Sequence, residues 1–161
     1  MNTRTTTTAA VTGALLLLTL VGCTDTPSKS VPAAKAPASS QPAAGLTAKT
    51  AAAGLADATG VTTLGDPQDN TGGCSNKAAG QEPNANDCAQ LMTTDTVSIY
   101  EFKSAAVAAT WTAKMSNVEG TDWRQVDRFA LSWGARDQAL TSDERRGELV
   151  KALGDLVARD K

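Results

Sequence analysis

Evenly spaced prolines divide this chain into a part that cannot fold alone and a part that can. Within residues 24–45 the prolines recur every five positions, at Pro27, Pro32, Pro37 and Pro42. The residues between them are mainly Ala, Ser, Thr and Lys, and Val31 is the only large apolar side chain in the segment. Such a segment buries too little apolar surface to offset its ordering entropy. We therefore predict a disordered tether that is partly polyproline II, and we expect the packed domain to follow it.

Aromatic side chains occur only in the second half of the sequence. All six lie after residue 99: Tyr100, Phe102, Trp111, Trp123, Phe129 and Trp133. This distribution predicts a densely packed core in the second half of the chain, within a single domain over residues 46–161. The chain has 15 basic and 17 acidic side chains, and no basic block that would indicate nucleic-acid binding. It contains no histidine, which excludes Ser-His-Asp catalysis and zinc sites built on histidine.

An apolar run ending in a cysteine lies before the tether. Residues 9–20 are apolar and follow a polar start that carries Arg4. The run is too short to span a bilayer, which needs about 20 residues, but it has the length of a signal-peptide core. The sequence Leu20-Val21-Gly22-Cys23 resembles the lipobox of bacterial lipoproteins.

The lipobox resemblance implies a location and an anchor. In that family a diacylglycerol is attached to the cysteine sulfur, and a peptidase cuts just before the cysteine. The resemblance implies a signal peptide over residues 1–22, a lipidated Cys23 with its tether over 23–45, and a domain over 46–161. Two acyl chains would hold the protein on the extracytoplasmic face of the cell membrane. A secreted soluble protein is the alternative if Cys23 is not lipidated. The composition also resembles that of small surface lipoproteins of the actinobacterial type.

Hydrophobic periodicity predicts an α+β fold for residues 46–161. We expect helices over about 47–59, after Ser104, and after a capping box formed by Thr141 and Glu144. Strands are expected over 61–64, around Leu91 and Met92, over 96–102, and around Phe129, Leu131 and Trp133. In the strand over 96–102, Val97 and Ile99 share one face, and Tyr100 and Phe102 share the other. The order predicts about three helices packed on a sheet of 3–5 strands.

Assigning Cys23 to lipid leaves two cysteines, Cys74 and Cys88, which form an even pair. Outside the cytoplasm such a pair is oxidised, so we predict a disulfide. It would close a loop made almost entirely of turn-forming residues. For a loop of about 15 residues the chain-entropy estimate of the stabilisation is about 3 kcal/mol.

The sequence contains no recognised catalytic, nucleotide-binding or metal-binding motif. We therefore predict no catalytic residue, cofactor or metal, and we assign Asp122, Asp127, Asp143 and Glu144 to the surface and to helix caps. A calcium site built from the acidic turn residues Asp66, Asp69, Asn70 and Asp87 is the alternative.

Tryptophan supplies the candidate binding residue. We expect Trp111 and Trp133 in the core, and Trp123 to be exposed because it stands beside Gly120 and Asp122. An exposed tryptophan could stack on a sugar ring or on a partner protein.

The leading hypothesis is a membrane-anchored module without enzymatic activity that binds an envelope protein or a glycan. The alternative is a small cell-envelope hydrolase that uses carboxylates. That alternative needs two acids in one concave pocket, at least one of them with a raised pKa.

Overall fold

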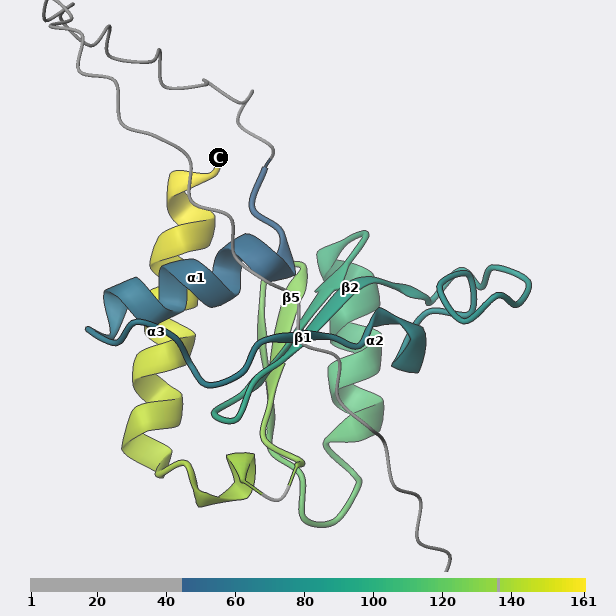
Figure 1. Ribbon diagram of the computed structural model, residues 1–161. Helices are drawn as coiled ribbons and strands as arrows, with labels where there is room; N and C mark the ends of the chain where they lie inside the picture. The colour runs from purple at the N-terminus through teal and green to yellow at the C-terminus, as the bar shows by residue number, and fades with distance from the viewer. Residues whose placement is uncertain (1–44, 136) are drawn as a thin grey trace, which may run out of the picture. The chain divides into compact units, whose positions relative to one another are not determined.

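The computed structural model describes residues 45–135 and 137–161. The predictions for the signal peptide, for Cys23 and for nearly all of the tether fall on residues 1–44, and so lie outside the described residues. The described part contains three α-helices, five strands and two short 3-10 helices (Figure 1). This arrangement confirms the predicted α+β domain.

The five strands form one sheet in the order β1-β2-β3-β5-β4, with every neighbouring pair antiparallel. The strands are β1 (Gln68–Asp69), β2 (Cys88–Thr93), β3 (Ser98–Phe102), β4 (Trp123–Val126) and β5 (Phe129–Ser132). A two-residue turn joins β4 to β5, and its first residue, Asp127, has a φ of +52°. Aspartate is among the few residues that adopt this left-handed backbone readily.

A crossover helix leaves room for the last strand, β5, between β3 and the edge strand β4. Helix α2 (Ala105–Met115) leads from β3 to β4, and both of these strands pair antiparallel with β5. Strands β3 and β4 are therefore parallel to each other, with β5 between them. The inserted strand β5 pairs with β3, which is distant in sequence, and with β4, which directly precedes it.

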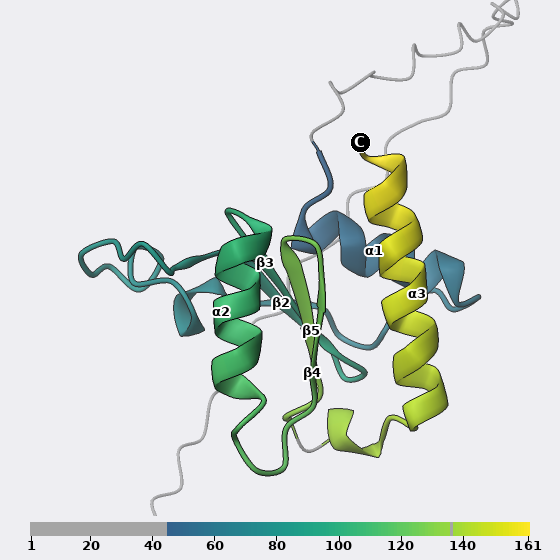
Figure 2. The same ribbon diagram turned by 180° about the vertical axis from the view of Figure 1, so that it is seen from behind.

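Two helices cover one face of the sheet. Helices α1 (Ala48–Ala58) and α3 (Asp143–Arg159) lie side by side on the face opposite α2 (Figures 1 and 2). Their apolar stripes enclose the larger of two hydrophobic clusters with the inward side chains of the sheet. Its largest buried members are Leu55, Ile99, Phe129, Leu131, Trp133, Leu149 and Leu153. Trp133 is therefore in the core, as predicted, whereas Leu156 and Val157 are only partly buried.

The close packing of α1 on α3 depends on a glycine that weakens α1 by itself. A Cβ atom at Gly54 would lie 2.8 Å from the Cδ2 methyl of Leu156. Glycine costs an isolated helix about 1 kcal/mol relative to alanine. Here the missing side chain leaves room for Leu156, so the tertiary contact offsets the weak local propensity.

Helix α2 and the disulfide loop cover the second face. The smaller cluster there contains Cys74, Cys88, Leu91, Phe102, Ala108, Trp123 and Ala130. Only Ala108 of α2 is fully buried, while its larger apolar residues, such as Val107 and Met115, are partly exposed. The alternation predicted for β3 is confirmed, because Ile99 faces the first cluster and Phe102 the second.

The helix starts follow the predicted capping logic with one shift. Thr47 forms a capping box with Thr50, and the Ser104 hydroxyl accepts a hydrogen bond from the Val107 N–H. The capping box expected between Thr141 and Glu144 is wrong. Ser142 is the N-cap of α3 instead, since its hydroxyl accepts from the Arg145 N–H.

The strand expected over residues 61–64 is not formed. The carbonyls of Leu64 and Gly65 accept hydrogen bonds from the Thr96 and Asp95 N–H groups, which belong to the turn between β2 and β3. The segment thus docks against a turn instead of extending a ladder, and Val61 is 39% exposed. The strand that borders β2 is the short β1.

The first described residues are fixed by side chains from distant parts of the chain. The Leu46 N–H donates to the Asp160 carboxylate at 2.9 Å, and Arg128 donates to the Leu46 carbonyl. The buried Glu101 carboxylate accepts from the Ala48 N–H at 3.0 Å and pairs with Arg128 at 3.2 Å. A sheet side chain therefore satisfies a free N–H at the start of α1, where the helix dipole favours negative charge.

Candidate functional site

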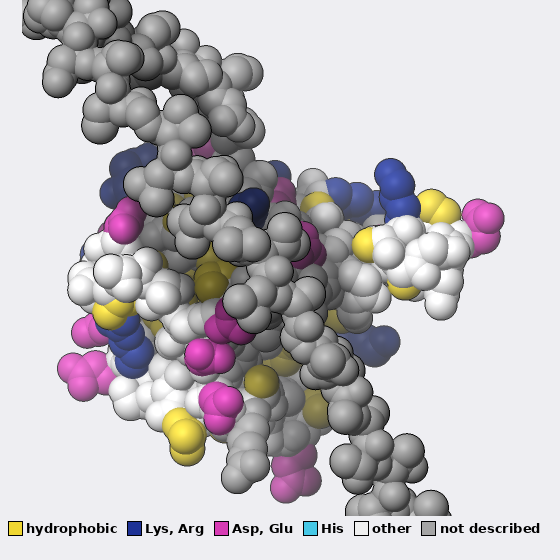
Figure 3. Space-filling view, in the orientation of Figure 1, with side chains coloured by type: hydrophobic (Ala, Val, Ile, Leu, Met, Phe, Trp, Pro, Cys, Tyr) yellow, Lys and Arg dark blue, Asp and Glu magenta, His cyan; other side chains and the backbone are white. Residues whose placement is uncertain are grey.

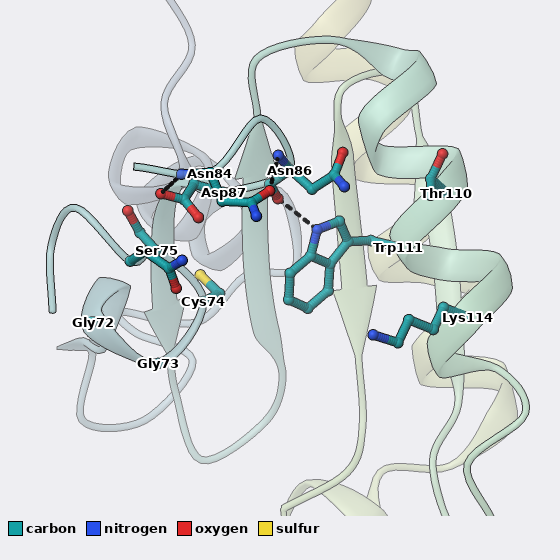
Figure 4. Close-up of a pocket in the computed structure, with 11 residues that line it drawn as sticks. Gly72, Gly73, Cys74, Ser75, Asn84, Asn86, Asp87, Thr110, Trp111 and Lys114 are labelled. Carbon is teal, nitrogen blue, oxygen red and sulfur yellow. Dashed lines mark hydrogen bonds between the residues drawn. The ribbon is translucent and has the colours of Figure 1, made fainter. Parts of the chain in front are cut away.

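The disulfide loop and helix α2 enclose a cleft of about 330 Å³ (Figure 4). One wall consists of residues 72–76 together with Asn84, Asn86 and Asp87, and the other consists of Thr110, Trp111 and Lys114 of α2. The cleft therefore lies over the thinner second face of the sheet.

The predicted disulfide between Cys74 and Cys88 is confirmed, with the two Cα atoms 5.5 Å apart. The Cys88 N–H also donates to the Cys74 carbonyl at 3.1 Å, so the base of the loop is held by a covalent bond and a hydrogen bond. The loop between them buries almost nothing. The disulfide therefore provides the order that a hydrophobic core would otherwise give.

Inside the loop, Asp87 organises the backbone on one side of the cleft. Its carboxylate accepts hydrogen bonds from the N–H groups of Asn84 at 3.1 Å and Lys77 at 3.3 Å. The Asn84 side-chain carbonyl in turn accepts from the Asn86 N–H at 2.9 Å. The hydrogen bond from the Asn84 N–H is the main cause that lowers the pKa of Asp87, so this side chain remains a carboxylate.

Trp111 forms the aromatic side of the cleft. Its indole Nε1–H donates to the Asn86 carbonyl at 2.6 Å, which links α2 to the loop (Figure 4). The ring packs against Phe102 with the centroids 5.7 Å apart. Trp111 packs against the second cluster but is only half-buried, so the prediction that it belongs to the core holds only in part. The reason is that the neighbouring loop covers the indole ring only in part, and the uncovered space beside the ring forms the cleft.

Trp123 is the opposite case. It was expected to be exposed, but it is 9% exposed and packs on Tyr100 with the ring centroids 4.6 Å apart. The expectation is wrong because Trp123 begins β4, and the alternation of that strand points its side chain under α2. Trp123 is thus more deeply buried than Trp111, which reverses the expected order.

Among the acids of the second half, Asp122 joins two elements through ion pairs. Asp122 forms ion pairs with Arg124 at 2.8 Å and Arg146 at 3.1 Å, which ties β4 to α3. Burial raises the pKa of Asp122, but the hydrogen bonds and charges of the two arginines outweigh burial and lower it. Both guanidinium groups also lie 5.4 Å from the ring centroid of Trp133.

Calcium ligands predicted near the loop do not converge. Asp69, before the disulfide loop, accepts hydrogen bonds from the N–H and hydroxyl of Thr71. Asp87 instead accepts a hydrogen bond from the Lys77 N–H inside the loop. Within residues 45–135 and 137–161, no group of three acidic, cysteine or histidine side chains is placed to hold a metal ion. In the same part of the chain, no helix has both the length and the apolar composition of a membrane span.

The cleft residue that the sequence did not single out is Trp111, together with the asparagines that line the same cleft. A signal was present: the loop contains Asn76, Asn84 and Asn86 but only a few charged residues, so it is rich in uncharged hydrogen-bonding side chains. Comparison with known proteins adds no further guide to this site. No protein-family model matches the chain, and no curated protein and no solved structure is significantly similar to it.

Proposed function

We propose that this chain is an extracytoplasmic lipoprotein, anchored through Cys23, whose domain binds a ligand in the Trp111 cleft. The lipobox resemblance at Leu20–Cys23 supports the anchor. The Cys74–Cys88 disulfide supports the location, because structural disulfides persist in oxidising compartments and are rare in the cytosol. The tether would hold the domain away from the membrane surface.

The observation that carries the binding function is the combination of a held aromatic ring with a polar loop around one cleft. The Asn86 carbonyl and Phe102 hold the indole of Trp111 in place. The rest of the lining is mainly small or uncharged and polar. Concave sites that combine an aromatic surface with a few placed polar groups are typical of small-molecule binding.

The alternative hydrolase receives no support from a specific observation. Glu148 and Asp155 share a hollow beside α3, but each is ion-paired, with Arg145 at 3.1 Å and Lys151 at 3.0 Å respectively. In the Trp111 cleft the single carboxylate is Asp87, and its pKa is lowered rather than raised. A binding module is therefore the function we propose.

The anchor is tested by mass spectrometry of the mature protein from the membrane fraction. We expect an N-terminal peptide that begins at Cys23 and carries diacylglycerol. The Cys23→Ala variant should lack the lipid and leave the membrane fraction, whereas a Cys74→Ser/Cys88→Ser variant should keep it. An unmodified Cys23 in the purified membrane protein would overturn the anchor.

The binding function is tested by NMR of the isotopically labelled chain during titration with soluble envelope components. We expect shifts confined to the Trp111 indole and to the amides of residues 75–87. Signals of α1 and α3 should not move, because these helices lie on the opposite face. Shifts spread equally over both faces, or none at all, would contradict the cleft as a binding site.

A further inference from the structure

We infer that the ligand of the Trp111 cleft is a sugar, stacked on the indole and hydrogen-bonded by the polar side chains of the loop. The inference rests on the proposed function, because it assigns a ligand class to the same cleft. It joins four properties of the site: a fixed aromatic surface, uncommitted amides, balanced charge and small size.

The aromatic surface of Trp111 suits the apolar face of a pyranose. A sugar ring presents axial C–H groups on one side, and these pack on the electron-rich face of an indole. Trp111 is fixed at Nε1 by the Asn86 carbonyl and on its ring by Phe102, so little side-chain freedom remains to be lost on binding. The ring is also half-buried, which leaves part of its surface for a ligand.

The polar side chains around the ring suit hydroxyl groups. In the part of the chain that the structure describes, no hydrogen bond uses the side-chain amides of Asn76 and Asn86 or the ammonium of Lys114. A carboxamide both donates and accepts, and a sugar hydroxyl does the same. Neighbouring hydroxyls on one ring edge can therefore pair with these amides from the loop side of the cleft.

The charge of the cleft favours a neutral ligand over a polyanion. Its lining contains one carboxylate, Asp87, and one ammonium, Lys114. The protruding loop presents mainly uncharged surface, with a few Lys and acidic side chains (Figure 3). A site for phosphate or nucleic acid would need an excess of positive charge, which this lining lacks.

The size of the cleft separates a sugar from a folded protein partner. A volume of about 330 Å³ lies near the lower end of small-molecule sites, which span about 300–1,000 Å³. A stable protein interface instead buries about 800 Å² on each partner. The cleft therefore fits one or a few sugar units, either free or as part of a longer glycan.

The test titrates the full isotopically labelled chain with glucose, N-acetylglucosamine and β-linked tetramers of each, and it follows the tryptophan indole N–H signals. We expect saturable shifts at Trp111, with Trp123 and Trp133 unchanged because both are buried elsewhere. Tighter binding of a tetramer identifies a glycan chain as the source. Equal affinity for the monosaccharide identifies a free sugar.

Variants then assign the contacts. Trp111→Ala and the double variant Asn76→Ala/Asn86→Ala should each weaken binding about tenfold or more, as expected for the loss of stacking or of two hydrogen bonds. Trp111→Phe keeps an aromatic ring in the site and should weaken binding by a smaller factor. Gln81→Ala is the matched control, because Gln81 is exposed on the same loop but does not line the cleft. Unchanged signals from α1 and α3 establish that each variant is folded.

The inference is overturned if no sugar shifts the Trp111 signal, or if Trp111→Ala and the asparagine double variant bind as tightly as the parent chain. A peptide or an oligophosphate that binds where sugars fail would replace the ligand class, yet leave the proposed binding module standing. An unmodified Cys23 would remove the proposed location and leave this titration unaffected. The two failures are therefore distinguishable.

Discussion

The two faces of the sheet are built by different means. On the first face, α1 and α3 bury a continuous set of aliphatic and aromatic side chains, including Leu55, Leu149 and Leu153, which are fully buried. On the second face, α2 buries only Ala108 completely, and a disulfide supports the loop beside it. The first face therefore stabilises the domain through burial, and the second uses a covalent link where burial is small.

The difference explains why the candidate site lies on the second face. The first face also has hollows, one beside α3 and one between α1 and Met92, but no aromatic side chain lines either of them. The second face is covered only by α2 and the disulfide-linked loop. A cleft remains between these two elements, and Trp111 lines it. Low burial and a fixed backbone thus occur together at the cleft, as expected for a preformed binding site.

The largest expected effect comes from opening the first face. Leu153→Ala removes a fully buried side chain of α3 and should lower the free energy of unfolding by about 2–5 kcal/mol. Leu140→Ala is the matched control, because Leu140 is 84% exposed and should change stability by about 0.5 kcal/mol or less. Urea denaturation followed by circular dichroism measures both. Equal effects of the two substitutions would contradict the packing of α3.

The next effect tests whether the disulfide supports the second face specifically. Cys74→Ser/Cys88→Ser should lower the free energy of unfolding by about 3 kcal/mol. Hydrogen exchange of the backbone amides should become faster mainly for residues 75–87. The relative exchange rates of the amides in α1 and α3 should stay the same as in the parent chain. An equal increase in the exchange rates of the amides on both faces would contradict the claim that the disulfide supports the second face specifically.

A pair of glycines sharpens the comparison within the segment that leads from α1 to β1. Gly65 has a φ of +92° and a Cβ there would lie 2.5 Å from the Asp95 carboxylate, whereas Gly60 has a φ of +72° and open space around it. An alanine at either site suffers backbone strain of about 1–2 kcal/mol. Gly65→Ala should cost about 1–3 kcal/mol more than Gly60→Ala because of the added steric conflict. Thermal denaturation of the two variants measures this difference, and equal costs would contradict the close contact.

The smallest effect concerns acid. Asp122 near the first face and Asp87 on the second both have lowered pKa values in the folded state. A lowered folded-state pKa contributes stability above the unfolded-state pKa of about 3.9, and this contribution is lost as the pH falls through the folded-state value. Asp122→Asn should therefore flatten the fall in unfolding free energy between about pH 5 and pH 2.

Asp87→Asn gives the contrasting case for the second face. Because Asp87 organises an exposed loop, its replacement should alter the amide signals of residues 77–86 and leave the acid dependence of global unfolding nearly unchanged. Chemical shifts and denaturation curves over the same pH range separate the two variants. A larger global effect for Asp87 than for Asp122 would reverse the comparison.

Local sequence patterns predicted the helices, strands and caps better than they predicted which side chains are buried. The alternation of Ile99 with Phe102, the serine cap of α2 and the cysteine pair are all readable from neighbouring residues, and the structure confirms them. In contrast, the sequence could not predict that Trp123 is more deeply buried than Trp111. Whether a tryptophan is covered depends on which element lies over its face of the sheet, and periodicity contains no information about that element.

The same reason explains the other differences. Glu101 is a strand acid that is buried because α1 begins over it and offers the Ala48 N–H group, which strand periodicity alone does not indicate. The segment over residues 61–64 has strand-forming residues, yet it meets a turn rather than a free strand edge. The candidate site was therefore predictable in composition, as a stapled polar loop, but its aromatic wall was not.

The hydrogen bonds around Leu46 have a mechanical consequence. A pull on the chain that precedes Gly45 acts first on the Leu46 contacts with Asp160, just after α3, and with Arg128, in the turn between β4 and β5. The load is thus divided between the last helix and the sheet before it reaches α1. The domain would therefore resist unravelling from its N-terminal side until one of these two contacts breaks.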